Sequence, residues 1–294
     1  MNYTLKRNDL GYYEVANKPT SDELQAYYAE KYYQESKGSY EAVYTPPEER
    51  YIYNQIKRKH AVISKYNKSP QNLLDVGCGE GFTLAYFKKI GLSVKGIDYS
   101  SAGVASKNPD CMDDLEVGDI FELFDAEIKS NNKYDIIWLQ NVLEHVLDPV
   151  RLLKDLHNLV SYGEFGSGIF VITVPNDFSI VQLTAKKLGL IENEFWVAPP
   201  DHLSYFNYRS LVNIVESTGW NVIEAISDFP IDWFLYNDNS NYVMDKKVGK
   251  AAHKARVMLD NMISDLPAED VIEFYSSMAK LGIGRDITVF VQSK

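Results

Sequence analysis

Short apolar runs alternate with amphipathic stretches along the chain from about residue 71 onward. Most of the runs have the length and apolar character of buried strands. They cover residues 73–76, 94–98, 115–119, 134–139 and 169–174. The amphipathic stretches between them have helical spacing and cover residues 82–90, 100–107 and 149–160. Because parallel strands need crossover connections, which are usually helices, the alternation predicts a doubly wound α/β sheet with helices on both faces.

Two later apolar runs, at 222–226 and 287–291, are predicted to complete the sheet. The first follows a predicted helix over residues 208–218 with Gly219 as its stop signal. Between the two runs the chain shows neither an internal repeat nor a low-complexity linker. Residues 228–284, with predicted helices at 249–262 and from about Pro267, are therefore expected to form an insertion packed onto the sheet.

The first 70 residues are rich in tyrosine and charge, and two helices are expected there. Thr20 and Glu23 form a capping-box pattern at the start of the first. The second is expected to follow Pro46 and to end at about Lys65. The first helix would run through Leu24, Tyr27, Tyr28 and Tyr32.

Composition and charge narrow the class of protein. The 294 residues are 45% hydrophobic and 24% charged, as in a folded globular protein, and the net charge is −11. Nucleic-acid binders usually carry a basic face, so a small or locally recognised substrate is expected, with no nucleic acid. No run approaches a membrane span, and the start lacks a signal-peptide pattern. With only Cys78 and Cys111, neither a disulfide framework nor a zinc site is expected, and the protein is predicted to be cytoplasmic.

The strongest motif is a glycine-rich loop that follows the first predicted strand. Gly77, Gly79 and Gly81 would let the backbone turn sharply and approach a ligand closely. A dinucleotide fingerprint, as in a nicotinamide-dependent oxidoreductase, would need its third glycine at position 82, which is Phe82. Asp75 would repel a pyrophosphate, whereas it suits a ligand that carries an ammonium or sulfonium charge.

With these residues the chain resembles the class I S-adenosylmethionine-dependent methyltransferases, whose first motif looks like Asp-x-Gly-x-Gly-x-Gly. The resemblance implies a Rossmann-like sheet, mostly parallel with an antiparallel last strand, and a loop that faces the methionine end of S-adenosylmethionine. It also implies that Asp98 accepts both ribose hydroxyls. Asp119 would accept the adenine amino group, with Ile120 against the ring. The full set of cofactor-binding residues implied by the resemblance is Asp75, Gly77, Cys78, Gly79, Gly81, Asp98, Tyr99, Asp119, Ile120, Gln140 and Asn141.

After the fourth predicted strand, residues 139–149 resemble a family stretch that ends in Glu-His-Val-x-Asp-Pro. In ubiquinone-biosynthesis O-methyltransferases a similar Glu-x-x-Glu-His segment is associated with a divalent metal. Here Asn141 occupies the first of those positions, and the remaining Glu144 and His145 make a poor site for a hard cation. No metal is therefore expected.

A base is needed if the methyl acceptor is a hydroxyl or a carbon acid, and histidine is the commonest choice. His202 belongs to a segment, 201–206, that resembles the His-Leu-x-Tyr-Phe segment of methyltransferases acting on sugars. It is either a base or acceptor-orienting residue, or a structural histidine. Asp201 would orient it or cap a turn. His145 is the second catalytic candidate, with a structural role at a helix start or under the cofactor as the alternative.

The insertion offers candidates for binding the acceptor. His253 and Arg256 are three residues apart, so one helix face could present both. With Arg285 they would form a clamp for a phosphate or carboxylate, whereas a solvated helix face is the alternative. Tyr205 and Tyr242 complete the predicted acceptor-binding residues.

These observations predict methyl transfer to a small-molecule acceptor. A sugar or nucleotide-linked sugar of surface-polysaccharide or natural-product biosynthesis is the first choice. A quinone or other hydroxylated metabolite is an alternative, and so is a non-catalytic S-adenosylmethionine-binding module. The chain would divide into an N-terminal helical cap (1–70), a cofactor-binding domain (71–227 with 285–294) and an acceptor-binding lid (228–284). Oligomeric state and the choice among O-, N- and C-methylation stay open.

Overall fold

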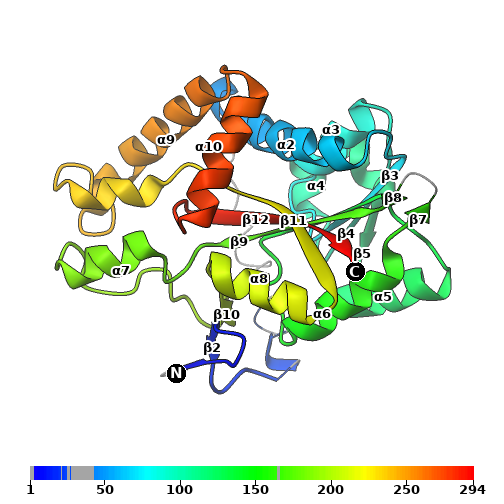
Figure 1. Cartoon of the computed structure of the whole chain (residues 1–294), viewed down its shortest axis with the longest axis horizontal. Coiled ribbons are helices and arrows are strands. Elements are labelled where there is room, and N and C mark those ends of the chain that lie inside the picture. Colours follow the sequence, from blue (N-terminus) through cyan, green and yellow to red (C-terminus); the bar gives the residue numbers. More distant parts are fainter. Residues whose placement is uncertain (1–2, 21, 25–26, 28–42, 164–165) are drawn as a thin grey trace.

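The computed structural model describes residues 3–20, 22–24, 27, 43–163 and 166–294 (Figure 1). Its centre is a seven-stranded sheet in the order β11-β12-β9-β6-β3-β4-β5. The five strands β5, β4, β3, β6 and β9 run parallel to one another, and β12 is antiparallel to both of its neighbours. The predicted doubly wound sheet with an antiparallel last strand is therefore confirmed. The strands are β3 Asn72–Val76, β4 Ser93–Asp98, β5 Leu115–Val117, β6 Ile136–Gln140, β9 Ile169–Pro175, β11 Trp220–Ser227 and β12 Asp286–Ser293.

Helices cover both faces of the sheet because side chains of a strand alternate between faces. Leu73 packs in one hydrophobic cluster together with Ile63, Phe87 and Tyr275. The next residue, Leu74, packs in the opposite cluster. The helices on the first face are α2 Pro46–Tyr66, α3 Phe82–Lys89, α4 Ala102–Lys107 and α10 Ala268–Lys280, and those on the second are α5 Ile120–Lys129, α6 Pro149–Asp155 and α8 Tyr208–Ser217.

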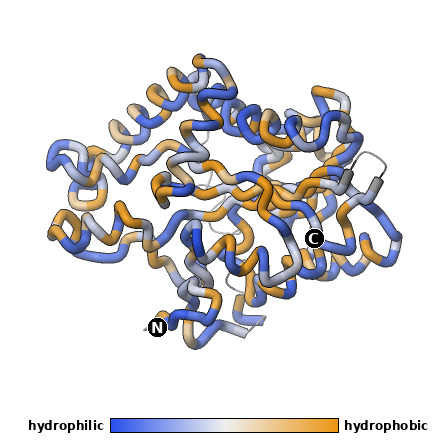
Figure 2. Tube along the Cα trace, in the orientation of Figure 1, coloured by the Kyte–Doolittle hydropathy of each residue, from blue (hydrophilic) through white to orange (hydrophobic). Residues whose placement is uncertain are grey.

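The colouring by hydropathy agrees with this layering, since the central strands are largely apolar whereas the helices alternate between polar and apolar positions (Figure 2). The predicted helix over 149–160 consists of α6 followed by the 3₁₀ helix η2 Leu156–Leu159. Besides these strands and helices and a small N-terminal sheet, the chain forms α7 Ile180–Lys187, α9 Gly249–Ile263, the strands β7 Tyr162–Gly163 and β8 Gly166–Ser167, and the 3₁₀ helices η1 Pro109–Asp114, η3 Ile231–Tyr236 and η4 Lys246–Val248.

A second, small sheet lies at the N-terminus, where only helices were expected. Strands β1 Leu5–Arg7 and β2 Tyr13–Val15 form an antiparallel pair. Strand β10 Ser204–Tyr205 adds to β2, with Tyr205 opposite Tyr13. The N-terminal hairpin therefore joins the chain just after His202. Of the predicted first helix, Tyr28 and Tyr32 lie outside the described residues.

The N-terminal helix α2 and the insertion form one layer, although they are far apart in sequence. Helix α9 packs against α2, and α10 packs against β11. Arg58 of α2 forms a buried ion pair with Asp260 of α9 at 3.0 Å, and the Tyr275 hydroxyl donates to Asp260 at 2.5 Å. Helices from the N-terminal region and from the insertion therefore pack together over one face of the sheet. No helix in the described part of the chain is long and apolar enough to cross a membrane.

Candidate active site

A cavity of about 1550 Å³ lies at the carboxyl ends of the parallel strands. Strands β3 and β6 are neighbours there, and the chain leaves them toward opposite sides, which is where doubly wound folds bind ligands. The lining brings together the predicted cofactor residues and all three predicted catalytic residues. These are Asp75, Gly77, Cys78, Gly79, Gly81, Asp98, Tyr99, Asp119, Ile120, Gln140 and Asn141, with His145, Asp201 and His202.

The glycine loop between β3 and α3 has a backbone that other residues rarely adopt. Gly77, Gly79 and Gly81 have φ angles of 70°, 55° and 76°. A Cβ on Gly77 would also lie 2.4 Å from Cγ2 of Val142, in the loop after β6. Both the left-handed backbone and the close approach of the two loops therefore require glycine at position 77.

Asp98, at the end of β4, holds this loop in place. One carboxylate oxygen accepts the Gly79 amide at 2.8 Å and the other accepts the Ser100 amide at 3.0 Å. Burial raises the pKa of Asp98, against the lowering effect of these backbone hydrogen bonds. The Tyr99 amide lowers the pKa of Asp98 in the same way, and the carboxylate keeps acceptor capacity for a hydroxyl of a ligand in the cavity.

Asp75 is a buried acid beneath the same loop. Burial, and then the Asp98 carboxylate, raise its pKa to about 8 against the opposing charge of Lys59. A cationic group of a ligand in the cavity would favour the ionised form of Asp75.

Asp119 caps helix α5 by accepting the amides of Phe121 at 2.9 Å and Glu122 at 3.2 Å. Its second oxygen accepts the Tyr99 hydroxyl at 2.9 Å. Ile120 is buried next to it and lines the cavity. The helix-capping role therefore accompanies the predicted adenine contact, which stays a prediction.

Lys59 of α2 is a functional candidate that no motif indicated. Its ammonium donates to Oε1 of Gln140 at 2.8 Å and to Oγ1 of Thr173 at 3.0 Å, and lies 5.1 Å from the Trp138 ring centre. Because an ammonium only donates, Oε1 of Gln140 is taken, and the amide nitrogen is left to donate to a ligand in the cavity. Burial lowers the pKa of Lys59 to about 8. The signal in the sequence was a lysine between Ile56 and Val62, on the apolar face of α2.

Asn141 follows β6 in the left-handed region, with a φ of 55°. Its amide donates to the Thr173 carbonyl at 2.9 Å. Asparagine tolerates this conformation better than most residues, and such positions are concentrated at functional sites. The conformation turns the chain from the sheet edge into the segment that carries Glu144 and His145.

The two histidines meet at one end of the cavity. Their ring centres are 4.8 Å apart, and the rings are nearly perpendicular at 83°. Nδ1 of His145 lies 2.6 Å from the Asp201 carbonyl oxygen. Because a carbonyl only accepts, Nδ1 carries the hydrogen, and Nε2 of neutral His145 holds the lone pair. Asp201 thus orients His145 through its backbone. The Tyr205 hydroxyl donates to the His202 carbonyl at 2.8 Å.

Glu144 lies beside this pair and was not among the predicted site residues. It is 1% exposed and lines the cavity, and neither of its carboxylate oxygens has a hydrogen-bond partner among the described residues. Oε1 lies 3.8 Å from Nε2 of His145. Burial raises the pKa of Glu144 well above its ordinary value, against the lowering effect of its own backbone amide, and the nearby carboxylates of Asp177, Asp286 and Asp201 raise the pKa further. The signal in the sequence was its place before His145 in the segment that resembles the Glu-x-x-Glu-His stretch.

Glu144, His145 and His202 each bring one ligand atom within 4.8 Å of the others, a donor set that could hold a metal ion. Carboxylates that bind metals are usually oriented by further hydrogen bonds, which Glu144 lacks among the described residues. The expected absence of a metal stays a prediction.

The predicted acceptor-binding residues lie outside the residues that line this cavity. Arg256 and His253 do share a helix face, with Nη2 of Arg256 2.9 Å from Nδ1 of His253. Arg285 forms an ion pair with Asp177 at 3.1 Å. The Tyr242 hydroxyl donates to Asp232 at 2.5 Å, and Tyr205 is buried. These side chains hold the insertion and the neighbouring loops together, and their predicted contact with the acceptor stays a prediction.

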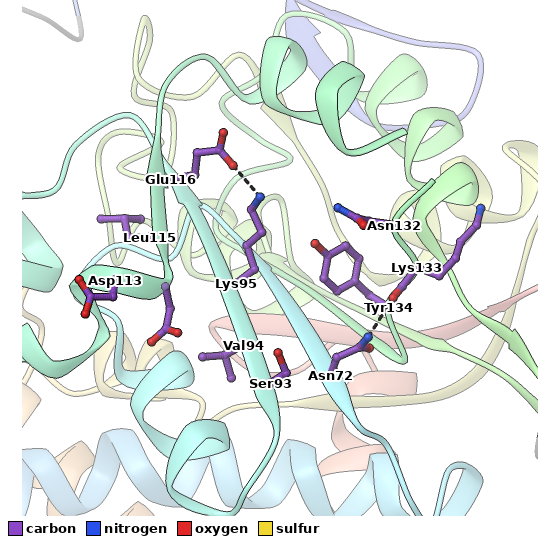
Figure 3. A pocket seen from close by; sticks show the side chains of 11 residues that line it. Asn72, Ser93, Val94, Lys95, Asp113, Leu115, Glu116, Asn132, Lys133 and Tyr134 are labelled. Carbon is purple, nitrogen blue, oxygen red and sulfur yellow. Dashed lines mark hydrogen bonds and ion pairs between the residues drawn. The ribbon is translucent and has the colours of Figure 1, made fainter. Parts of the chain in front are cut away.

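A smaller cavity of about 550 Å³ lies at the amino ends of β3, β4 and β5 (Figure 3). Lys95 there contacts Glu116 and Glu127, each at 2.6 Å, and Asn72 donates to the Lys133 carbonyl at 2.9 Å. These polar groups form ion pairs and hydrogen bonds with neighbouring protein groups. None of the predicted site residues lines this cavity.

A family model described as "Methyltransferase domain" matches residues 49–225. The ubiquinone biosynthesis O-methyltransferase of Coxiella burnetii is 27% identical over 157 residues, which cover 52% of this chain and 65% of that protein. A probable S-adenosylmethionine-dependent methyltransferase of Mycolicibacterium smegmatis is 24% identical over 180 residues, 58% of this chain and 62% of that protein. The chain thus spans about two thirds or less of the length of these relatives.

Among solved structures, a SAM-dependent methyltransferase from Archaeoglobus fulgidus matches with a TM-score of 0.51 and 17% sequence identity. The match covers 90% of this chain and 100% of that one. At this identity the match shows a shared fold, which agrees with the strand order of the sheet.

Proposed function

Because the chain belongs to the class I S-adenosylmethionine-dependent methyltransferase family, we propose that it transfers the methyl group of this cofactor to a small-molecule acceptor bound in the same cavity. The observation that carries the proposal is the common lining: the glycine loop, Asp98 and the paired imidazoles of His145 and His202 all face one space. A ligand-binding end and an end that can move a proton are thereby next to each other.

The cofactor end fits a ligand with a diol and positive charges. Asp98 would bind the ribose diol, the loop from Gly77 to Gly81 would face the methionine moiety, and Gln140 would donate its amide hydrogens. Asp75 is a buried acid whose ionised form such a ligand would stabilise. The cofactor supplies a methyl group on a sulfonium, so the main task of the protein is to align donor and acceptor.

At the other end we assign the base to His145. The sequence favours His202 for this role, whereas the fixed hydrogen on Nδ1 leaves Nε2 of His145 ready to accept a proton from an acceptor hydroxyl. His202, whose ring lies edge-to-face against His145, would orient the acceptor. With the cofactor bound, the acceptor oxygen would form its bond to the methyl carbon as the methyl–sulfur bond breaks, which leaves neutral S-adenosylhomocysteine, and the proton of the acceptor hydroxyl would pass to Nε2 of His145.

A sugar or nucleotide-linked sugar is the proposed acceptor. The support is the resemblance of residues 201–206 to methyltransferases acting on sugars, and a cavity end lined by the polar groups of Glu144, His145, Asp201 and His202. O-methylation of a quinone precursor is the second candidate, favoured by the relatives named ubiquinone biosynthesis O-methyltransferase.

Transfer of labelled methyl from S-adenosylmethionine to a panel of monosaccharides, nucleotide sugars and catechols tests the proposal. We expect label on a sugar, and we expect His145→Asn to lower turnover about 100-fold while cofactor affinity is kept. Label on catechols alone would select the second candidate. Cofactor binding without transfer to any acceptor would indicate a non-catalytic module.

A further inference from the structure

The carboxyl group of Glu144 accepts no hydrogen bond from another described residue. It is almost completely buried at the acceptor end of the cavity, and neither of its oxygens accepts a hydrogen bond from a described residue. His145 cannot supply one in its neutral form, because its Nδ1 hydrogen is directed to the Asp201 carbonyl. A buried acceptor group without a donor costs free energy, so the arrangement calls for a ligand that donates.

The charges around Glu144 indicate the sign of that ligand. The carboxylates of Asp177, Asp286 and Asp201 all act on it unfavourably. Arg285 is engaged by Asp177 at 3.1 Å. Among the described residues that line the cavity, Arg151 is the one lysine or arginine, and its guanidinium lies 3.3 Å from Asp155 and against the Phe121 ring. The acceptor end therefore holds an excess of acid and disfavours an anionic group beside His145.

We propose that the acceptor carries a protonated amine next to its reacting hydroxyl, as a vicinal amino sugar does, and that Glu144 binds the ammonium group. This inference rests on the proposed function, and it narrows the sugar class to amino sugars. The ammonium donates hydrogen bonds to the ionised Glu144 carboxylate, while the neighbouring hydroxyl gives its proton to Nε2 of His145. Oε1 of Glu144 lies 3.8 Å from Nε2 of His145, so two adjacent groups of one acceptor could reach both atoms.

A divalent cation is the other positive ligand that this end could hold, with Glu144, His145 and His202 as donors. Mg²⁺ is disfavoured because hard cations need several oxygen ligands, and this set offers one carboxylate. One carboxylate and two imidazoles do match the donor set of catalytic zinc. The cation therefore enters the test as a competing outcome.

The test is calorimetric titration of the protein, saturated with S-adenosylhomocysteine, with glucosamine, galactosamine and mannosamine and with their N-acetyl forms. We expect at least one amine to bind at least about tenfold more tightly than its acetylated partner, and we expect Glu144→Gln to abolish this difference. Equal binding of both forms, no binding of any amine at tens of millimolar, or an unchanged preference in Glu144→Gln would overturn the proposal.

Two controls separate the outcomes. Glu216→Gln, on the exposed face of α8, removes an acid of the same kind and should keep the preference for the amine. Titration with Mg²⁺ or Zn²⁺ alone should show no binding that depends on Glu144; such binding would assign the carboxylate to a metal. If wild-type protein binds the cofactor and methylates a neutral acceptor, the assignment of an amino-sugar acceptor fails but methyl transfer stands. If wild-type protein does not bind the cofactor, the proposed methyl transfer itself fails.

Discussion

At the scale of single residues, the site contains two kinds of side chain. Some belong to sequence motifs, and others are recognised only from their contacts in the folded structure. The place of Asp75, Gly77 and Asp98 in the cavity lining could be predicted because it depends on spacing along the chain beside a strand end. Lys59 and Glu144 could not, because their significance depends on what lies opposite them. Lys59 reaches Gln140 from a helix 81 residues away in the sequence, and Glu144 is notable for the partners it lacks.

Lys59→Met tests whether the Gln140 amide is held for a ligand. We expect turnover or cofactor affinity to fall about tenfold, since one orienting hydrogen bond of a charged donor is lost. The thermal midpoint should fall as well, because Oε1 of Gln140 and Oγ1 of Thr173 lose a buried donor, although Met fills the space and removes a charge that burial disfavours. Steady-state kinetics and thermal unfolding measure the two effects. Lys57→Met, on the exposed side of the same helix, is the matched control and should behave like wild type. If both variants have the same turnover and cofactor affinity, Lys59 does not hold the Gln140 amide for a ligand.

At the scale of elements, the strands and helices of the central sheet could be predicted from apolar periodicity, whereas the antiparallel last strand was implied by the family resemblance alone. The N-terminal hairpin could not. Strands β1 and β2 have three residues each, too few for a periodic signal, and they are stabilised by the distant strand β10. The Val15 amide donates to the Leu203 carbonyl at 3.0 Å, next to His202. The hairpin therefore supports the loop on which the histidine lies.

Val15→Asp tests this support. Val15 is fully buried, so an unpaired charge there should detach the hairpin from β10. We expect turnover to fall at least about tenfold through misplacement of the His202 loop, while cofactor affinity stays within about twofold because the glycine loop is at another edge of the cavity. Parallel measurement of turnover and cofactor binding checks this. Lys6→Ala, on exposed β1, should change neither; loss of cofactor binding in Val15→Asp would show a wider structural role.

At the scale of the whole molecule, the net charge of −11 first argued only against a nucleic-acid partner. In the structure, part of that acidity is buried around the cavity and beside it. Burial, as the largest cause, raises the pKa values of Asp75 and Asp228 to about 8 and that of Asp177 to about 7. The folded protein therefore holds protons that the unfolded chain would release at much lower pH.

These raised pKa values predict how stability depends on pH. A carboxyl whose pKa is higher in the folded state stabilises the fold at low pH, and this contribution is lost as pH rises through the folded value. Between about pH 6.5 and 8, above the ordinary pKa of histidine, we expect the free energy of unfolding to fall by about 1–2 kcal/mol. Urea denaturation at several pH values measures it. Asp75→Asn should make the unfolding free energy depend less steeply on pH. An unfolding free energy that rises with pH in this window would show that the pKa values of these carboxyl groups are not raised.

We infer that the cavity at the carboxyl ends of β3, β4 and β6 binds S-adenosylmethionine. Calorimetric titration of wild-type protein and Asp98→Ala with this cofactor tests it most directly, with circular dichroism to confirm that both are folded. We predict micromolar binding by wild type and affinity at least about 30-fold weaker in Asp98→Ala, because a buried carboxylate that can accept charge-assisted or paired hydrogen bonds is lost. No binding by wild type at high micromolar cofactor, or equal binding by both proteins, would show that Asp98 and this cavity do not form the cofactor site.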